Sequence, residues 1–196
     1  MATWKQGMPK AIIGLLGVFC LAAAAPASAE TIEEKAEVCG ECHGKQGIPP
    51  DKTMPIIWGQ HVGYTYLQLR DYKSGARKNE TMQAIVADLE RDDMLALAEY
   101  FAKKPWPRNA QPPARPEVAV RAAAANVSVG CTGCHQASYI GEGTQPRIAG
   151  QLKDYLGSTM LAIRKGERAN NPGMTTLMAA TSEQDIAALA EYLAGL

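Results

Sequence analysis

The chain has 196 residues, of which 46% are hydrophobic, and its 20 basic residues balance its 20 acidic residues. Because there is no basic surplus and no basic stripe, nucleic acid is excluded as a partner. The length allows one ordinary domain or two small ones once a leader peptide has been removed.

The first 29 residues have the pattern of a secretory signal peptide. Two lysines form a basic n-region, residues 11–25 are small and apolar, and Ala27-Ser28-Ala29 matches an A-x-A cleavage site. The apolar run is short for a membrane span, although an uncleaved N-terminal anchor stays an alternative. We therefore expect cleavage before Glu30 and export to the bacterial periplasm.

Three segments of the first half have helical spacing of apolar residues. Residues 32–41 lead into a Cys-x-x-Cys-His sequence, and residues 64–74 carry apolar and aromatic residues up to a stop at Gly75. The last of the three places one apolar face on Met94, Leu97, Ala98 and Phe101. Because no segment alternates as a strand does, we expect only helices, joined by long loops.

A proline-rich connector follows at residues 105–116. Five prolines forbid a continuous helix there and favour an extended, semi-rigid segment. We take this connector as the boundary between two domains. The predicted division of the chain is a leader at 1–29, a first domain at 30–104 and a second domain at 117–196.

The second half repeats the order of the first. Residues 118–129 lead into another Cys-x-x-Cys-His sequence, and residues 155–165 form a helix that stops at Gly166. Ser182 and Asp185 resemble a capping box before a last helix. Its apolar face carries Ile186, Leu189, Ala190 and Leu193.

The two halves are related as an internal repeat. Aligning Cys39 with Cys131 brings residues of the same type together along nearly the whole chain after the leader. Two homologous modules explain such a repeat. The equivalent pairs include Pro55 and Pro146, Gln60 and Gln151, Tyr64 and Tyr155, Arg77 and Arg168, and Asn79 and Asn170.

Each module contains one Cys-x-x-Cys-His motif, which is the attachment site of c-type haem. In such a site two cysteines bond to the porphyrin and the histidine supplies an axial nitrogen to the iron. The sequence therefore predicts two covalently bound haem c groups. The residues that hold them are Cys39, Cys42 and His43 in the first module and Cys131, Cys134 and His135 in the second.

The motif cysteines account for four of the five cysteines in the chain. The fifth, Cys20, lies in the leader, where the bulky Phe19 before it argues against lipid attachment. No cysteine is left for a disulfide, and bonds to haem protect the pairs from an oxidising compartment. Zinc binding or thioredoxin-like chemistry is a weaker alternative, because neither requires the paired methionines described next.

Met82 and Met174 are the predicted distal iron ligands. Each lies at the same distance after the first cysteine of its motif, in a predicted loop before the last helix. They are the only candidates that are methionine in both modules. A thioether favours ferrous iron and fills the sixth position, which leaves no open site for oxygen or peroxide. The other candidates are Met54, Met94, Met160, Met178 and His61.

Further paired residues are expected around each haem. Backbone carbonyls of the Pro55 and Pro146 loops could accept a hydrogen bond from the proximal histidines, or the prolines could be turn residues only. Arg77 and Arg168 either pair with haem propionates or are solvated. The residues expected to line the pockets are Trp58, Tyr64, Tyr100, Tyr155 and Tyr192.

These motifs resemble the di-haem cytochrome c4 family, which is built from two class I cytochrome c domains. The matching pattern is Cys-x-x-Cys-His, Pro-x-x-x-Gly-Gln, an aromatic helix ending at glycine, a methionine and a closing Leu-Ala-x-Tyr helix, all present twice. The resemblance implies an all-α fold in which a few helices wrap around one covalent haem in each domain. It also implies propionates near the domain contact, and a carrier that is soluble or membrane-associated.

The leading interpretation is a non-enzymatic carrier of single electrons between a quinol-oxidising complex and a terminal oxidase or other acceptor. The alternative is an electron-accepting subunit of a periplasmic dehydrogenase, such as a flavocytochrome c sulfide dehydrogenase. An enzyme in its own right, such as a di-haem peroxidase or a thiosulfate-oxidising cytochrome, needs an exchangeable iron site. The paired methionines argue against that third class.

Overall fold

A computed structural model describes residues 1–3 and 30–196, so the predicted leader lies almost wholly outside the described residues. The described part is helical, with nine helices, and an isolated bridge between Glu142 and Gln145 is its only β pairing. None of the helices in this part of the chain is long and apolar enough to cross a membrane. The all-α prediction is therefore confirmed.

The first module has α1 (Ile32–His43), α2 (Val62–Lys73), α3 (Glu80–Val86) and α4 (Arg91–Ala102). A capping box starts α1, because the Thr31 hydroxyl accepts from the Glu34 amide while the Glu34 carboxylate accepts from the Thr31 amide. α4 packs against α1 and α2, with Leu97 and Phe101 buried between them. The predicted apolar face of this last helix is confirmed.

The second module has α5 (Pro116–Val129), α6 (Thr132–His135), α7 (Lys153–Arg164), α8 (Pro172–Ala179) and α9 (Glu183–Ala194). α9 packs against α5 and α7 through its predicted apolar face. The Ser182 hydroxyl accepts from the Asp185 amide at 3.1 Å, as predicted. The capping box is incomplete, because the Asp185 carboxylate accepts its hydrogen bond from the Ser182 hydroxyl, at 2.6 Å.

The connector is extended, as its prolines predict, but it lies along the second module. Gln111 donates to the carbonyls of Gln151 and Ala194 at 3.0 and 3.2 Å, and it accepts from the Lys153 amide at 2.9 Å. The Arg147 guanidinium lies 4.6 Å from the centre of a Trp106 ring. These contacts hold the connector to the second module.

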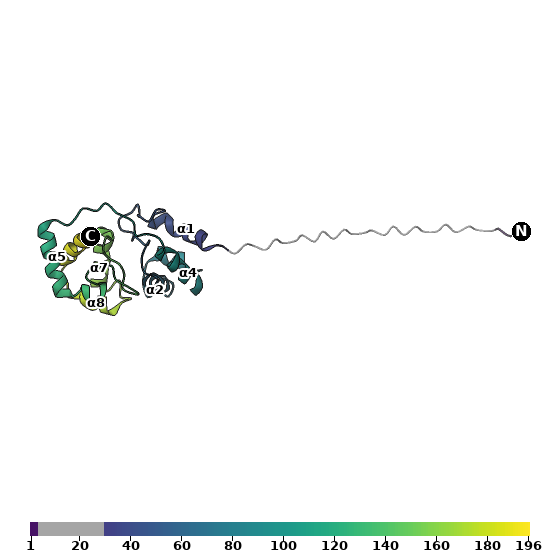
Figure 1. The fold of residues 1–196 in the computed structure, drawn as a ribbon. Coiled ribbons are helices and arrows are strands. Elements are labelled where there is room, and N and C mark those ends of the chain that lie inside the picture. Colours follow the sequence, from purple (N-terminus) through teal and green to yellow (C-terminus); the bar gives the residue numbers. More distant parts are fainter. Residues whose placement is uncertain (4–29) are drawn as a thin grey trace.

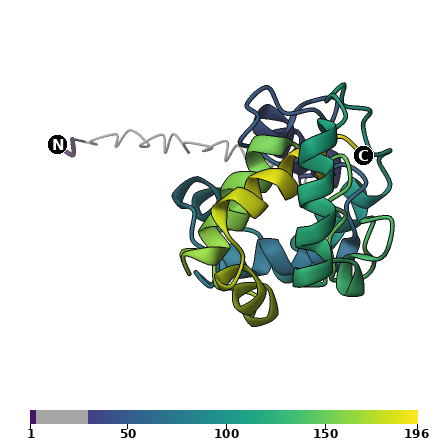
Figure 2. The ribbon, with the colours of Figure 1, turned by 90° about the vertical axis from the view of Figure 1, so that its left-hand side faces the viewer.

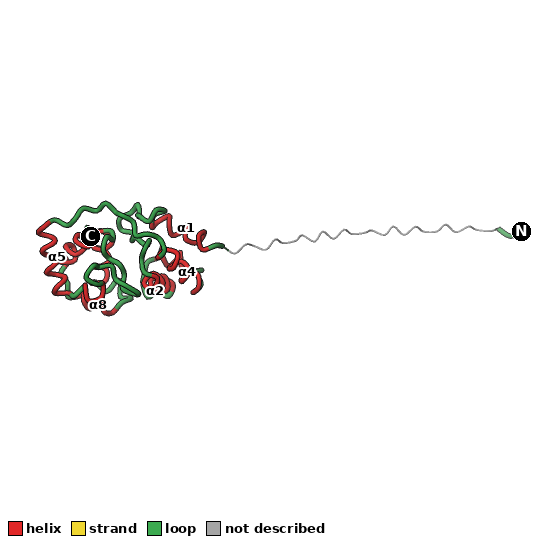
Figure 3. Tube along the Cα trace, viewed as in Figure 1, coloured by secondary structure: helices red, strands yellow, loops and turns green. Residues whose placement is uncertain are grey.

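The two modules lie side by side, with α1, α2 and α4 in one and α5, α7 and α8 in the other (Figure 1). Viewed from the end of the second module, α5, α7 and α9 stand in front of the first module (Figure 2). Loops fill the middle of the molecule between the two sets of helices (Figure 3). The loops that follow the two Cys-x-x-Cys-His motifs therefore meet at the boundary between modules.

Candidate haem sites and the boundary between them

A helix end carries the Cys-x-x-Cys-His motif in both modules. α1 extends past its predicted end, so that Cys39, Cys42 and His43 lie in its last turns. In the second module α5 ends at Gly130, which is left-handed with φ of 78°, and the single turn α6 then carries Cys134 and His135. Cysteines three residues apart on a helical turn share one face, where both can meet one porphyrin edge.

The motif cysteines are unpaired, and burial disfavours a thiolate at Cys39 and Cys131, the first cysteine of each motif. Burial raises the pKa of Cys39 to about 11 and also raises the pKa of Cys131. An uncharged thioether fits these positions better than a thiolate bound to a metal. Within residues 1–3 and 30–196, no three His, Cys, Asp or Glu side chains gather to hold a metal ion.

The proximal histidines are buried and held by the predicted proline loops. His43 and His135 are 8% and 6% exposed. Nδ1 of His43 lies 2.8 Å from the Pro55 carbonyl, and Nδ1 of His135 lies 2.9 Å from the Pro146 carbonyl. The carbonyls fix Nδ1 as the protonated nitrogen, which leaves the lone pair of Nε2 available to a ligand-binding role. Burial lowers the pKa of both histidines, so each is held neutral, as a ligand must be.

The sequence predicted loops around Met82 and Met174, and this was wrong. Both residues lie in the first turns of the short helices α3 and α8. Asn79 starts α3, and its side chain accepts from the Met82 amide at 2.9 Å. Asn171 starts α8 and accepts from the Met174 amide at 3.0 Å. Each capping side chain takes one of the amides that a helix start leaves without a partner. Both methionines are half-buried, and an asparagine side chain accepts a hydrogen bond from the backbone amide of each.

The helix-capping asparagines show that one residue pair in the internal repeat was aligned wrongly. The sequence alignment placed Asn79 on Asn170, whereas the structure gives Asn79 and Asn171 the same role. The alternative methionines Met94, Met160 and Met178 are buried in the helical cores, at 5%, 8% and 2% exposure. They are therefore packing residues, as the repeat analysis indicates.

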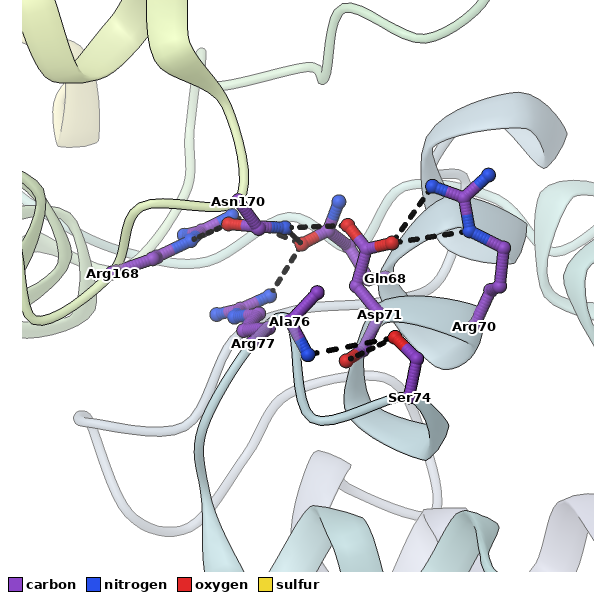
Figure 4. A network of polar contacts seen from close by, with 8 residues as sticks. All are labelled: Gln68, Arg70, Asp71, Ser74, Ala76, Arg77, Arg168 and Asn170. Carbon is purple, nitrogen blue, oxygen red and sulfur yellow. Dashed lines mark hydrogen bonds and ion pairs between the residues drawn. The ribbon is translucent and has the colours of Figure 1, made fainter.

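A polar network joins the modules between α2 and the loop before α8 (Figure 4). Gln68 Oε1 accepts hydrogen bonds from Arg77 at 2.9 Å, from Arg168 at 3.1 Å and from Asn170 at 3.2 Å. Asn170 also donates to the Asp71 carboxylate at 2.8 Å. Asn170 therefore serves the boundary instead of a helix start.

Tyr64 and Tyr155 were expected to line haem pockets, and they bind the paired arginines across the boundary. Arg77 donates to the Tyr155 hydroxyl at 3.3 Å, and Arg168 donates to the Tyr64 hydroxyl at 3.1 Å. Burial raises the pKa of Tyr155, but the charges of Arg77 and Arg168 outweigh it and lower that pKa overall. The lowered pKa of Tyr155 thus reflects the positive charge of two guanidiniums that lie close together between the modules.

Both arginines are half-buried, and among the described residues neither forms an ion pair with a carboxylate. Two guanidiniums in such a place need acidic partners, and haem propionates have the required charge. Each module also supplies two cysteines, a buried imidazole and a half-buried thioether. The residues present therefore fit one haem group in each module.

Sequence reasoning missed the buried glutamines Gln60 and Gln151, which are 4% and 3% exposed. Each forms hydrogen bonds to the backbone of the other module, as described below. The signal was present in the repeat, because a polar residue of the same type follows the same glycine in both modules. Its meaning depends on the contact between modules, which no local pattern shows.

Comparison with known proteins gives consistent matches. A family model for cytochrome c matches residues 120–196. The chain is 32% identical to cytochrome c4 of Pseudomonas aeruginosa, covering 96% of this chain and 100% of that protein. It is 33% identical to the thiosulfate dehydrogenase electron acceptor of Stutzerimonas stutzeri, covering 82% and 80%. The crystal structure of reduced cytochrome c4 from Pseudomonas stutzeri matches with a TM-score of 0.73 and 28% identity, covering 84% and 96%.

Proposed function

Because this chain belongs to the cytochrome c4 family of di-haem electron carriers, we propose that it carries single electrons between redox proteins of the bacterial periplasm. The observation that carries the proposal is the duplicated site. Each module presents a motif of two cysteines and a histidine, a proline carbonyl on that histidine, and a methionine at a capped helix start.

The proposed axial ligands are His43 with Met82 in the first module and His135 with Met174 in the second. Haem c supplies an iron that alternates between ferric and ferrous states. The chain's part is to hold the imidazole and the thioether in place during this exchange. The proline carbonyls fix the imidazole rings, and the asparagine caps fix the methionine backbone. Ligands that stay in place suit transfer without bond-making.

The boundary network supports a role for Arg77 and Arg168 in holding haem propionates. Their guanidiniums meet at Gln68, so both lie where the two modules touch. Charge-assisted bonds from arginine to carboxylate are stronger than neutral ones, and they would neutralise both partners in a half-buried place. Propionates held there would bring the two haem sites together at the boundary.

The compartment and the division of the chain are also part of the proposal. The leader pattern at residues 1–29 supports secretion to the periplasm, where covalent haem would occupy both cysteine pairs. We propose modules at 30–104 and 117–196, joined by the connector at 105–116. Two methionine-ligated irons would leave no open coordination site, which supports a carrier over an enzyme.

A second candidate is a dedicated electron acceptor of a periplasmic dehydrogenase. The similarity to the thiosulfate dehydrogenase electron acceptor of Stutzerimonas stutzeri favours it, since that relative is matched over both modules. The candidate partners are thus a quinol-oxidising complex with a terminal oxidase in the first case, and a dehydrogenase in the second. Both roles use the same two haem sites.

The test begins with the secreted protein. Mass spectrometry under denaturing conditions should show two added haem masses, and redox titration should show two one-electron centres. In Cys134→Ser one covalent link should be lost or weakened. Pull-down from periplasmic extract then separates a free carrier from a dehydrogenase subunit. A secreted chain without porphyrin mass would refute the proposal for both roles.

A further inference from the structure

Two buried glutamines exchange hydrogen bonds across the module boundary in a reciprocal way. Gln151 Oε1 accepts from the Ile56 amide at 2.9 Å, and its Nε2 donates to the Ile56 carbonyl at 3.0 Å. Gln60 forms the same pair of bonds with Arg147, at 2.9 and 3.0 Å. Ile56 and Arg147 are equivalent in the repeat. Each glutamine therefore holds one backbone residue of the opposite module from both sides.

The peptide group that each glutamine holds is also the one that binds the proximal histidine. The Ile56 amide and the Pro55 carbonyl belong to one peptide group, and that carbonyl accepts from His43 Nδ1 at 2.8 Å. A continuous hydrogen-bonded chain thus runs from Gln151 of the second module to His43 of the first.

The mirror chain has the same form. The Arg147 amide, which Gln60 Oε1 binds, shares its peptide group with the Pro146 carbonyl that binds His135 at 2.9 Å. Gln60 belongs to the first module and His135 to the second. The two hydrogen-bonded chains therefore cross the boundary in opposite directions.

We propose that Gln151 and Gln60 are positioning residues that tune the redox potential of the haem in the opposite module. This inference rests on the proposed ligation of iron by His43 and His135. An acceptor on the amide of a peptide group polarises its carbonyl, and a more polarised carbonyl is a stronger acceptor for the imidazole N–H. The imidazole then becomes a stronger electron donor and favours ferric iron.

The direction of the effect follows from this polarisation. Without Gln151, the Pro55 carbonyl accepts more weakly from His43, the imidazole donates less, and the ferrous state of the first haem is favoured. The potential of the first haem should rise while that of the second stays. Loss of Gln60 should raise the potential of the second haem alone. This crossed pattern separates tuning from a general loosening of the boundary.

The test uses holoprotein carrying Gln151→Met or Gln60→Met, which keep side-chain length and lose both hydrogen bonds to the opposite module. Paramagnetic NMR during redox titration follows each haem separately, and Met82→Ala and Met174→Ala assign the signals to modules. Gln151→Asn keeps the amide but withdraws it by one methylene, which provides a milder variant should methionine prevent folding.

The matched control is His61→Leu. His61 Nε2 lies 2.8 Å from the Ile140 carbonyl, so the residue also bonds across the boundary, but its hydrogen-bond partner is not a proline peptide. The second module has leucine at the equivalent place, Leu152, so the fold accepts that side chain. We expect His61→Leu to weaken the boundary and leave both potentials unchanged.

A several-fold shift in the ratio of the two reduced haems, in opposite directions for the two glutamine variants, supports the inference. Unchanged potentials, or a shift of the haem in the mutated module itself, would overturn it. If the spectra of Met82→Ala and Met174→Ala match the wild type, the proposed methionine ligands are wrong, whereas a protein without bound haem would refute the proposed function. The two failures are therefore distinguishable.

Discussion

Arg168 donates a hydrogen bond of 3.1 Å to the hydroxyl of Tyr64, which lies 104 residues earlier in the chain. Arg77 and Tyr155, the equivalent residues of the repeat, form the mirror contact at 3.3 Å. Each arginine thus reaches the tyrosine of the opposite module. The boundary is therefore held by hydrogen bonds whose donor lies in one module and whose acceptor lies in the other.

Replacing Tyr64 with phenylalanine should weaken this boundary. The change removes one of the acceptors of Arg168, and a hydrogen bond to a charged group contributes about 1.5–3 kcal/mol. We expect a lower unfolding temperature and separation of the two modules into distinct calorimetric transitions. Tyr66→Phe is the matched control, because Tyr66 lies on the same helix and outside the polar network. Equal losses in both variants would contradict the role of Tyr64.

Met174→Ala should remove one of two iron–thioether bonds. The charge-transfer band of one haem should disappear and its potential should fall, because loss of the thioether disfavours ferrous iron. The control is Met178→Leu on the same helix, since Met178 is 2% exposed and belongs to the core. Visible absorption with redox titration measures both. Met178→Leu should keep the full band, and a full band in Met174→Ala would exclude that residue as a ligand.

Asn171→Ala should loosen the helix start that carries Met174. Loss of the side-chain bond to the Met174 amide should cost about 1 kcal/mol of local stability. The methionine should then be displaced more readily, so added imidazole should bind the ferric protein several-fold more tightly. Asn171→Ser restores a capping oxygen and should return imidazole binding toward the wild-type value. Identical affinities for alanine and serine variants would count against the cap.

Glu191→Gln should change the pH dependence of stability. Hydrogen bonds from Lys153 and Arg115 lower the pKa of Glu191 to about 2, against an ordinary value of 4.5. Its stabilisation is therefore present above about pH 4.5 and is lost as the pH falls through about 2. We expect the variant to lose no more than about 1 kcal/mol at neutral pH, because the ion pairs lie near the surface.

The difference between Glu191→Gln and the wild type should close as the solution is acidified. Urea unfolding at a series of pH values gives the two free energies of unfolding. Glu167→Gln, at an exposed position on the same module, is the control and should follow the wild type throughout. A difference that grows toward low pH would have the wrong sign and would exclude the ion pairs as its cause.

The long helices and the haem motifs could be predicted because their signals are local. An apolar face repeated over three turns marks α4 and α9, and proline and glycine mark where helices cannot continue. The carbonyl contacts of His43 and His135 could also be predicted, since a proline loop follows each motif at a similar distance.

The short helices and the crossed contacts could not be predicted in this way. α3 and α8 span seven and eight residues, too few for a hydrophobic period to stand out. The sequence does contain asparagines near these helix starts, but Asn170 and Asn171 are adjacent. Only the structure shows that Asn171 caps α8 and that Asn170 bonds across the boundary. The partners of Gln60 and Gln151 depend on how the modules dock.

Contacts that repeat with the partners exchanged are what two identical subunits make about a two-fold axis. The glutamine and arginine pairs give this chain the interface of a homodimer inside one polypeptide. A dimer of separate subunits falls apart on dilution, whereas a linker keeps the two surfaces at an effective concentration of order millimolar. The covalent connection thus makes the pairing of the two redox centres independent of the protein concentration.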